Sequence, residues 1–189
     1  MNNLINTSSN TLYGMVNENI LVNAKKIKLL VCDVDGVFSD GRIYLGNDGE
    51  ELKAFHTKDG FGIKALGSSG VAVAIITGRR SAIVAKRMAA LNVEHIIQGQ
   101  EDKLPALLTL AKELELTIDE IAYIGDDMPD LPCIIQVGLG IAVHDAHPMV
   151  LAKADYTTFT KGGFGAVREV CDLIMQCQNS LDSATGASI

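Results

Sequence analysis

The chain has 189 residues, of which 48% are hydrophobic and 21% are charged, which suits one domain with a large core. Its formal net charge is -7 and no basic cluster stands out, which argues against nucleic acid as a partner. No apolar run reaches the roughly 18 to 20 residues of a membrane span, and the polar start does not have the pattern of a signal peptide.

Residues 1–19 are expected to form a flexible tail, followed by a single domain over residues 20–180. The first predicted strand, at 27–32, ends in two aspartates, Asp33 and Asp35. Side chains two apart in an extended chain point the same way. Because carboxylates about 4 Å apart repel by roughly 4 kcal/mol at an effective dielectric near 20, a cation or a shared proton must offset the repulsion. The simpler alternative is an acidic turn that ends the strand.

Residues 42–57 alternate in polarity on both sides of Asn47-Asp48-Gly49, which predicts a β-hairpin inserted after the first strand. Its residues Tyr44, Leu45 and Phe55 are candidates for a subunit interface.

The rest of the chain alternates between β-branched apolar runs and amphipathic patterns. The later strands are expected at 71–76, 94–97, 121–125, 140–143 and 154–158, and helices at 81–92, 103–116 and 165–178. The segment TIDE at 117–120 has capping-box spacing, but a strand begins directly after it, so no helix is expected there. The alternation predicts an α/β fold with a doubly wound, mostly parallel sheet that is covered on both faces. Residues 181–189 are expected to be a tail.

Polar residues gather where the predicted strands end, and ligands of open α/β sheets bind at those carboxyl ends. They are Asp33 and Asp35 after the first strand, Thr77 after the second, Lys103 after the third, and Asp126, Asp127 and Asp130 after the fourth. Each of these alone could belong to an ordinary turn or helix start. Their joint placement in this order favours a common site. The four cysteines form no CxxC pair, which favours reduced thiols and a cytoplasmic location.

The segment DVDGV, the threonine of IITGRR, the lysine of QGQEDK and the segment GDDMPD together resemble the haloacid dehalogenase superfamily of phosphotransferases. The resemblance implies that Asp33 is the nucleophile that becomes an aspartyl-phosphate, and that Asp35 is the general acid and base. It further implies that Asp33, the backbone carbonyl of Asp35 and Asp126 bind Mg²⁺, and that Thr77 and Lys103 hold phosphoryl oxygens. Asp127 and Asp130 would support these groups from outside the coordination sphere.

Longer segments, among them GNDGEELKAFHTKDGFGIK and KGGFGAVREVCDLI, resemble a narrower family over about residues 20–189: capless phosphatases of the sugar acid 3-deoxy-D-manno-octulosonate (Kdo) 8-phosphate. That resemblance implies hydrolysis to Kdo and phosphate in lipopolysaccharide biosynthesis. It also implies a homotetramer assembled through the hairpins, and a C-terminal tail that closes a neighbouring subunit's site. Besides Asp35 and Lys103, the implied substrate-binding residues are His56, Thr57, Lys58, Asp59, Gly60, Lys64, Arg79 and Arg87.

Three alternatives remain open at this point. An enzyme of the same chemistry could act on another acidic sugar phosphate, such as a nonulosonate 9-phosphate, because the same carboxylate-binding residues would serve both. A non-catalytic binding module could share the fold, although such copies are expected to lose the nucleophile or the lysine. A response-regulator receiver also phosphorylates an aspartate beside Mg²⁺, but it lacks the DxD that starts this domain.

Overall fold

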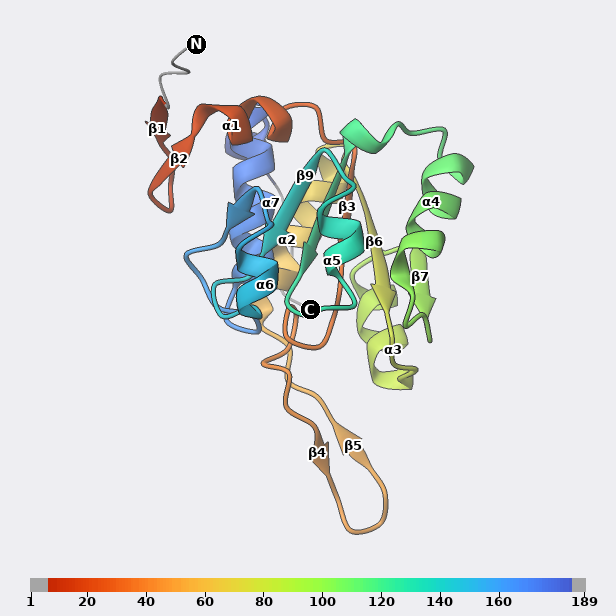
Figure 1. Ribbon diagram of the computed structural model, residues 1–189. Helices are drawn as coiled ribbons and strands as arrows, with labels where there is room; N and C mark the ends of the chain where they lie inside the picture. The colour runs from red at the N-terminus through yellow and green to blue at the C-terminus, as the bar shows by residue number, and fades with distance from the viewer. Residues whose placement is uncertain (1–6, 185–189) are drawn as a thin grey trace.

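A parallel sheet of six strands is the centre of the computed structural model, which describes residues 7–184 (Figure 1). The strand order is β10-β9-β8-β3-β6-β7. The strands are β3 (Leu29–Cys32), β6 (Ala72–Thr77), β7 (His95–Gln98), β8 (Ile121–Gly125), β9 (Leu139–Ala142) and β10 (Tyr156–Thr157). The chain runs outward from β3 to β7 and then returns to β8 on the other side of β3. The predicted doubly wound parallel sheet is thereby confirmed, with its switch point at β3 and β8.

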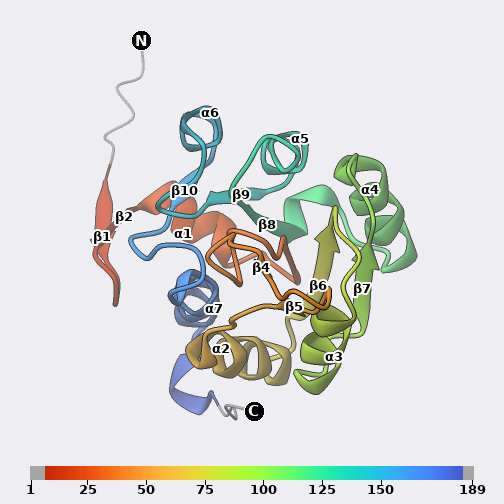
Figure 2. The ribbon, with the colours of Figure 1, turned by 90° about the horizontal axis from the view of Figure 1, so that it is seen from below.

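Helices cover both faces of this sheet. They are α1 (Glu18–Ala24), α2 (Thr57–Ser68), α3 (Ala82–Ala90), α4 (Lys103–Glu113), α5 (Leu131–Ile134), α6 (Pro148–Leu151) and α7 (Ala166–Cys177). Figure 2 shows α2, α3 and α7 on one side of the sheet and α4, α5 and α6 on the other. Every residue of β3, β8 and β9 is buried, as strands covered on both faces require. Within residues 7–184, no helix combines the length and the hydrophobicity needed to cross a bilayer.

Helix α7 joins distant parts of the chain, because it packs on both α2 and α1. Two of its acidic residues are buried and fully hydrogen-bonded. Glu169 accepts hydrogen bonds from the Tyr156 hydroxyl at 2.7 Å and from the Thr160 backbone and hydroxyl at 3.0 and 2.6 Å. Asp172 accepts from Arg168 Nε at 2.8 Å. Such partners offset the cost of burying a charge, so α7 is fixed in position as well as buried.

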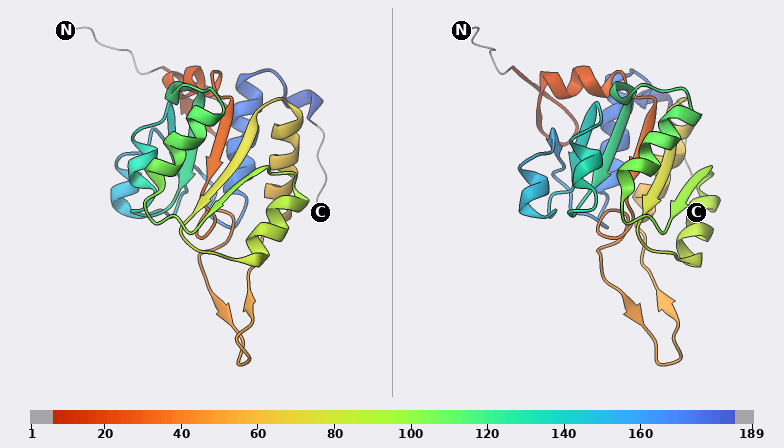
Figure 3. Two further views of the ribbon diagram at one scale, coloured as in Figure 1. Left: turned by 90° about the vertical axis from the view of Figure 1, so that its right-hand side faces the viewer. Right: turned by 45° about the vertical axis from the view of Figure 1, so that its right-hand side comes forward.

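The predicted hairpin consists of β4 (Tyr44–Leu45) and β5 (Glu51–Leu52), which pair antiparallel. Both views of Figure 3 show it projecting away from the sheet, at the end where the strands finish. Its apolar residues Tyr44, Leu45 and Leu52 are exposed, Leu45 at 72%. Phe55, in contrast, is partly buried against the core, so it offers less exposed apolar surface to an interface than Tyr44 and Leu45 do.

The predicted N-terminal tail is wrong for the residues that the structure describes. Strands β1 (Ser8–Asn10) and β2 (Met15–Asn17) form a second antiparallel hairpin. The Tyr13 hydroxyl at its turn donates a hydrogen bond of 2.8 Å to Asp172 of α7, which ties the hairpin to the body. Residues 1–6 of the predicted tail lie outside the described residues.

The turn before β8 and the C-terminus also differ from the sequence predictions. The TIDE segment forms a capping box on the 3-10 turn η1 (Ile118–Glu120), so the prediction that no helix forms there is wrong. The Thr117 backbone amide donates to Glu120 at 3.0 Å, and a single turn is long enough for this reciprocal capping. At the C-terminus, a 3-10 turn η2 (Leu181–Ser183) replaces the start of the predicted tail, and residues 185–189 lie outside the described part.

Candidate active site

The site lies where β3 and β8 end side by side. The strands pair in register through Cys32 and Ile124, and the Asp33 backbone amide still donates to the Ile124 carbonyl at 3.0 Å. Asp33 and Asp126 therefore leave the sheet next to each other. Gly36 must be glycine, because its φ is +94° and a Cβ there would lie 2.1 Å from the Asp126 carboxylate.

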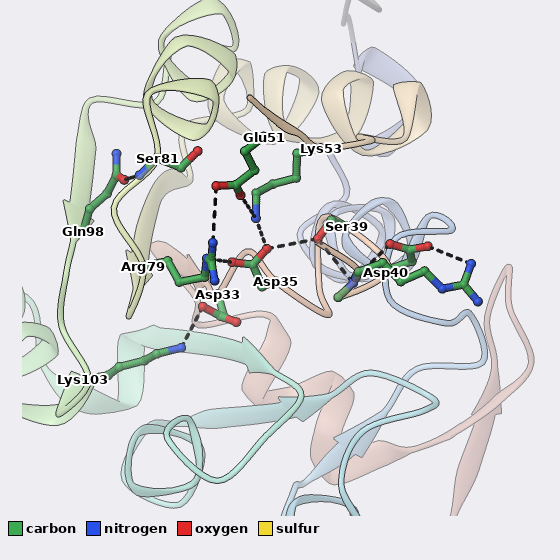
Figure 4. A network of polar contacts seen from close by, with 12 residues as sticks. Asp33, Asp35, Ser39, Asp40, Glu51, Lys53, Arg79, Ser81, Gln98 and Lys103 are labelled. Carbon is green, nitrogen blue, oxygen red and sulfur yellow. Dashed lines mark hydrogen bonds and ion pairs between the residues drawn. The ribbon is translucent and has the colours of Figure 1, made fainter. Parts of the chain in front are cut away.

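Lys103, at the start of α4, connects the acidic groups. Its ammonium donates to Asp33 Oδ1 and to Asp130 Oδ1, both at 2.7 Å, and all three side chains are buried (Figure 4 shows the contact with Asp33). Burial alone would lower the pKa of Lys103, but the charges of Asp33 and Asp130 outweigh it and raise the pKa. Lys103 is therefore a permanent cation at the place where the strands end.

Asp130 holds this arrangement together. Besides Lys103, its Oδ1 accepts from the Tyr123 hydroxyl at 2.7 Å, and its Oδ2 accepts from the backbone amides of Asp126 and Asp127 at 3.1 and 3.3 Å. Because four donors already use its oxygens, Asp130 is suited to position the loop after β8. The side chain of Asp127 is exposed and accepts from the Met128 amide, so it does not join the buried cluster.

Asp33, Asp126 and Asp130 each place a carboxylate oxygen within 4.8 Å of the other two, a spacing that could hold a metal ion. Burial, and next the charge of Asp130, raise the pKa of Asp33, although Lys103 opposes this. Burial and the charge of Asp33 raise the pKa of Asp126 to about 8. The ionised forms of these two carboxylates are thus disfavoured, and a hard divalent cation that prefers oxygen ligands would stabilise them. The donor set fits Mg²⁺, with Asp33 and Asp126 as the oxygens not already saturated by hydrogen bonds.

Asp35 points away from Lys103 and toward the hairpin (Figure 4). It pairs with Lys53, which follows β5, and with Arg79 Nε at 3.9 Å; Arg79 also donates to Glu51 at 3.3 Å. Sequence reasoning proposed Arg79 but missed Lys53 and Glu51. Their spacing of two residues in an extended arm, which puts both on one side, was the signal that could have found them. Thr77 is the last residue of β6 and is buried, so it lies at the strand end where the sequence placed it.

The structure places the predicted substrate-binding residues of α2 in two regions, one at the start of the helix and one farther along it. His56, Thr57 and Lys58 lie at the helix N-terminus, where His56 Nδ1 accepts from the Lys58 amide at 3.2 Å. Gly60 lies against Arg87 of α3, since a Cβ on Gly60 would be 2.5 Å from Arg87 Nη2. These positions form one group beside the hairpin stem.

Lys64 does not join the site within one chain. It lies seven residues into α2, about 10 Å along the helix axis from its start. There it lines a groove of about 680 Å³ at the opposite end of the sheet, beside the first residues of β6 and β7. The prediction that Lys64 contacts substrate is therefore not supported by the position of Lys64 in its own chain.

Asp59 was predicted to contact substrate, and the structure gives it another task. Its side chain is 1% exposed, and its Oδ1 accepts from the Arg168 backbone amide at 2.8 Å. Arg168 lies in the first turn of α7, whose N-cap is Gly165 and has no side chain to accept that bond. Asp59 thus caps α7 from α2, 109 residues away in the chain.

We expect Asp59→Ala to destabilise the protein by about 1 to 3 kcal/mol, because it leaves the α7 amide without an acceptor. Burial raises the pKa of Asp59 to about 7. The folded state therefore retains a proton that the unfolded chain loses near pH 4, so this group lowers stability as pH rises from about 4 to 7. Asp59→Asn should keep the acceptor and remove that pH dependence. Urea unfolding of the wild type, Asp59→Ala and Asp59→Asn at about pH 4 and about pH 7 measures the free energy of unfolding at each pH. If its pH dependence in Asp59→Asn equalled that of the wild type, the role of the Asp59 proton would be contradicted.

Comparison with known proteins gives consistent results. A family model described as haloacid dehalogenase-like hydrolase matches residues 90–169. A relative from Yersinia pestis named 3-deoxy-D-manno-octulosonate 8-phosphate phosphatase is 54% identical over 179 residues, which are 95% of this chain and 96% of the relative. The crystal structure of the Yersinia pestis protein of that name has a TM-score of 0.95 and 53% identity, and the match covers 97% of this chain and 100% of that one. The protein of that name from Moraxella catarrhalis, solved in complex with a magnesium ion, a phosphate ion and a Kdo molecule, has a TM-score of 0.87 and 49% identity, with 88% and 95% covered.

Proposed function

The chain belongs to the 3-deoxy-D-manno-octulosonate 8-phosphate phosphatase family of capless haloacid dehalogenase-like hydrolases, and from this premise we propose that it hydrolyses Kdo 8-phosphate to Kdo and phosphate. The observation that carries the proposal is the convergence of Asp33, Lys103 and Asp126 at the ends of neighbouring elements. In this role the enzyme serves lipopolysaccharide biosynthesis.

The proposed reaction has two steps, and a side chain of the site serves each bond that forms or breaks. Asp33 attacks phosphorus and becomes the aspartyl-phosphate, while Asp35 gives its proton to the departing sugar oxygen. Asp35 then takes a proton from the water that hydrolyses the intermediate. Thr77 and Lys103 bind the phosphoryl oxygens, and Lys103 places its charge where negative charge accumulates. Mg²⁺, held by Asp33, Asp126 and the backbone carbonyl of Asp35, would supply further positive charge to the phosphoryl group.

The substrate is a sugar acid, and cationic groups lie beside the catalytic pair. Arg79 is partly exposed next to Asp35, and its planar guanidinium suits a carboxylate. The N-terminus of α2, with Thr57 and Lys58, provides the positive end of the helix dipole and a positive charge on the same side. A substrate with a phosphate at one end and a carboxylate at the other fits this distribution.

The homotetramer and the cytoplasmic location predicted above are part of the proposal. The exposed apolar side chains of the β4–β5 hairpin, Tyr44, Leu45 and Leu52, support an assembly in which the hairpins of several copies cover one another.

A substrate panel tests the function. With Mg²⁺ present, kcat/KM for Kdo 8-phosphate should exceed that for nonulosonate 9-phosphates, and for sugar phosphates without a carboxylate, by at least about tenfold. Phosphate release is measured with each compound, and a reaction without enzyme gives the background. A clear preference for a nonulosonate 9-phosphate would replace the proposed substrate, and no turnover of any member would overturn the phosphatase assignment.

A further inference from the structure

We propose that Lys53, at the base of the β4–β5 hairpin, is a positioning residue for the reaction: it holds the Asp35 carboxylate in the orientation from which Asp35 gives its proton to the leaving oxygen. The inference rests on the proposed function and deepens it. It assigns a role to a residue that the motifs of the phosphotransferase fold do not include.

The contact itself is close and protected. The Lys53 ammonium is ion-paired with Asp35 Oδ1 (Figure 4), and the Lys53 side chain is only 1% exposed. The hairpin beyond it projects away from the sheet (Figure 3). A buried ammonium is costly unless it is paired. Lys53 is therefore held at Asp35, in contrast to a surface lysine, whose ion pair would be worth little.

Neighbouring groups fix the carboxylate on both oxygens. Ser39 Oγ donates to Asp35 Oδ1 at 3.4 Å, and Arg79 Nε lies 3.9 Å from Oδ2. Glu51 joins the two cations, since its carboxylate is 3.5 Å from Lys53 Nζ and 3.3 Å from Arg79 Nη2. The result is a small frame of alternating charges around the proposed general acid.

The frame also explains how two carboxylates two residues apart can do different work. Asp33 is paired with Lys103, from α4, and Asp35 is paired with Lys53, from the hairpin. Each aspartate thus has its own lysine, and the two lysines draw the carboxylates toward different sides of the site. Without Lys53, the Asp35 side chain keeps weaker contacts with Ser39 and Arg79 and can turn away from the leaving group.

The step that depends on this orientation is the first one. For this step the proton of Asp35 is on Oδ2, the oxygen that Lys53 does not contact. As the bond between Asp33 and phosphorus forms and the bond from phosphorus to the substrate oxygen breaks, this proton moves to that oxygen, which leaves as an alcohol, and Asp35 is left as a carboxylate beside the Lys53 ammonium. A weakly acidic leaving group needs this proton, whereas a p-nitrophenolate leaves readily without it. The value of kcat/KM covers substrate binding and this step, and it excludes the later hydrolysis of the intermediate. Because the two substrates below carry the same phosphate group, the ratio of their kcat/KM values reports the departure of the leaving group.

The experiment compares phenyl phosphate with p-nitrophenyl phosphate, neither of which has a carboxylate that Lys53 could bind. In K53M, kcat/KM for phenyl phosphate should fall about 30-fold or more, and that for p-nitrophenyl phosphate less than about threefold, because general acid catalysis contributes about 10² to 10⁴-fold. K53R keeps the charge, so the ratio of its kcat/KM values for the two substrates should match the wild-type ratio, even if both values are lower. K112M removes a lysine from the exposed end of α4 and should change neither substrate.

Other results overturn the inference. Equal losses on both substrates in K53M would mean a structural or phosphate-binding role, and no loss would mean no role. A loss confined to Kdo 8-phosphate would make Lys53 a ligand of the substrate carboxylate. If the ratio of kcat/KM values for the two aryl phosphates were the same in K53R as in K53M, the charge at position 53 would not be what orients Asp35. The proposed function fails separately, if the wild-type enzyme does not hydrolyse Kdo 8-phosphate.

Discussion

Asp33→Asn should reduce phosphate release by at least about 10⁴-fold, because an amide cannot form the acyl-phosphate bond on which both steps depend. The fold should survive, since asparagine still offers an oxygen to Lys103, which lies 2.7 Å from Asp33 Oδ1. The change also removes a negative charge from beside Asp126 and Asp130. Thermal unfolding and phosphate release, measured on the same preparation, separate lost chemistry from lost structure.

Asp119→Asn is the matched control for that experiment. It removes one carboxylate from the exposed turn before β8, at the end of the sheet opposite the site, and should retain wild-type turnover. If Asp33→Asn kept as much as about a tenth of the wild-type rate, the nucleophile would have to be another group.

Removing Mg²⁺ with a chelator should bring turnover to background, and adding Mg²⁺ back should restore it. On a protein of net charge -7, Asp33 and Asp126 face a phosphate dianion, and Lys103 alone does not balance them. Phosphate release is followed before chelation, after it, and after Mg²⁺ is returned. Turnover that continues unchanged in the chelator would exclude a metal-dependent reaction.

The Mg²⁺ requirement should also depend on pH. The raised pKa values of Asp33 and Asp126 mean that, without metal, protons occupy this site near neutral pH. Mg²⁺ needs the deprotonated carboxylates, so the concentration that gives half-maximal activity should rise as pH falls below about 8. Mg²⁺ titrations at about pH 6 and about pH 8.5 test this, and equal midpoints would contradict the raised pKa values.

The sequence was informative where function depends on local pattern. The apolar run before Asp33 and the position of Asp126 after a second run were enough to predict strand ends, and parallel sheets bring such ends together. In the same way, Lys103 after the third strand was predicted to lie at this edge, and it does. The roles of these residues in catalysis remain predictions that the experiments above address.

Contacts between distant segments could not be predicted in this way. Nothing near Asp59 in the sequence indicates that it caps α7, because the acceptor is needed 109 residues later. The spacing of Glu51 and Lys53 indicates only that both lie on one side of the hairpin arm. Tertiary packing sets the direction of that arm relative to the sheet, so the pairing of Lys53 with Asp35 could not be predicted. The N-terminal hairpin was missed for a similar reason, since its stability depends on Tyr13 reaching Asp172 of the last helix.

The position of α7 has a consequence for how the protein is made. Helix α2 is synthesised in the first half of the chain, but the helix that covers it, α7, ends only at Cys177. The ribosome delivers residues in order and encloses the most recent ones, so the part of this sheet face that α7 covers beside α2 stays exposed until α7 has left the ribosome. A transcript truncated before α7 should therefore yield a product that aggregates or is degraded.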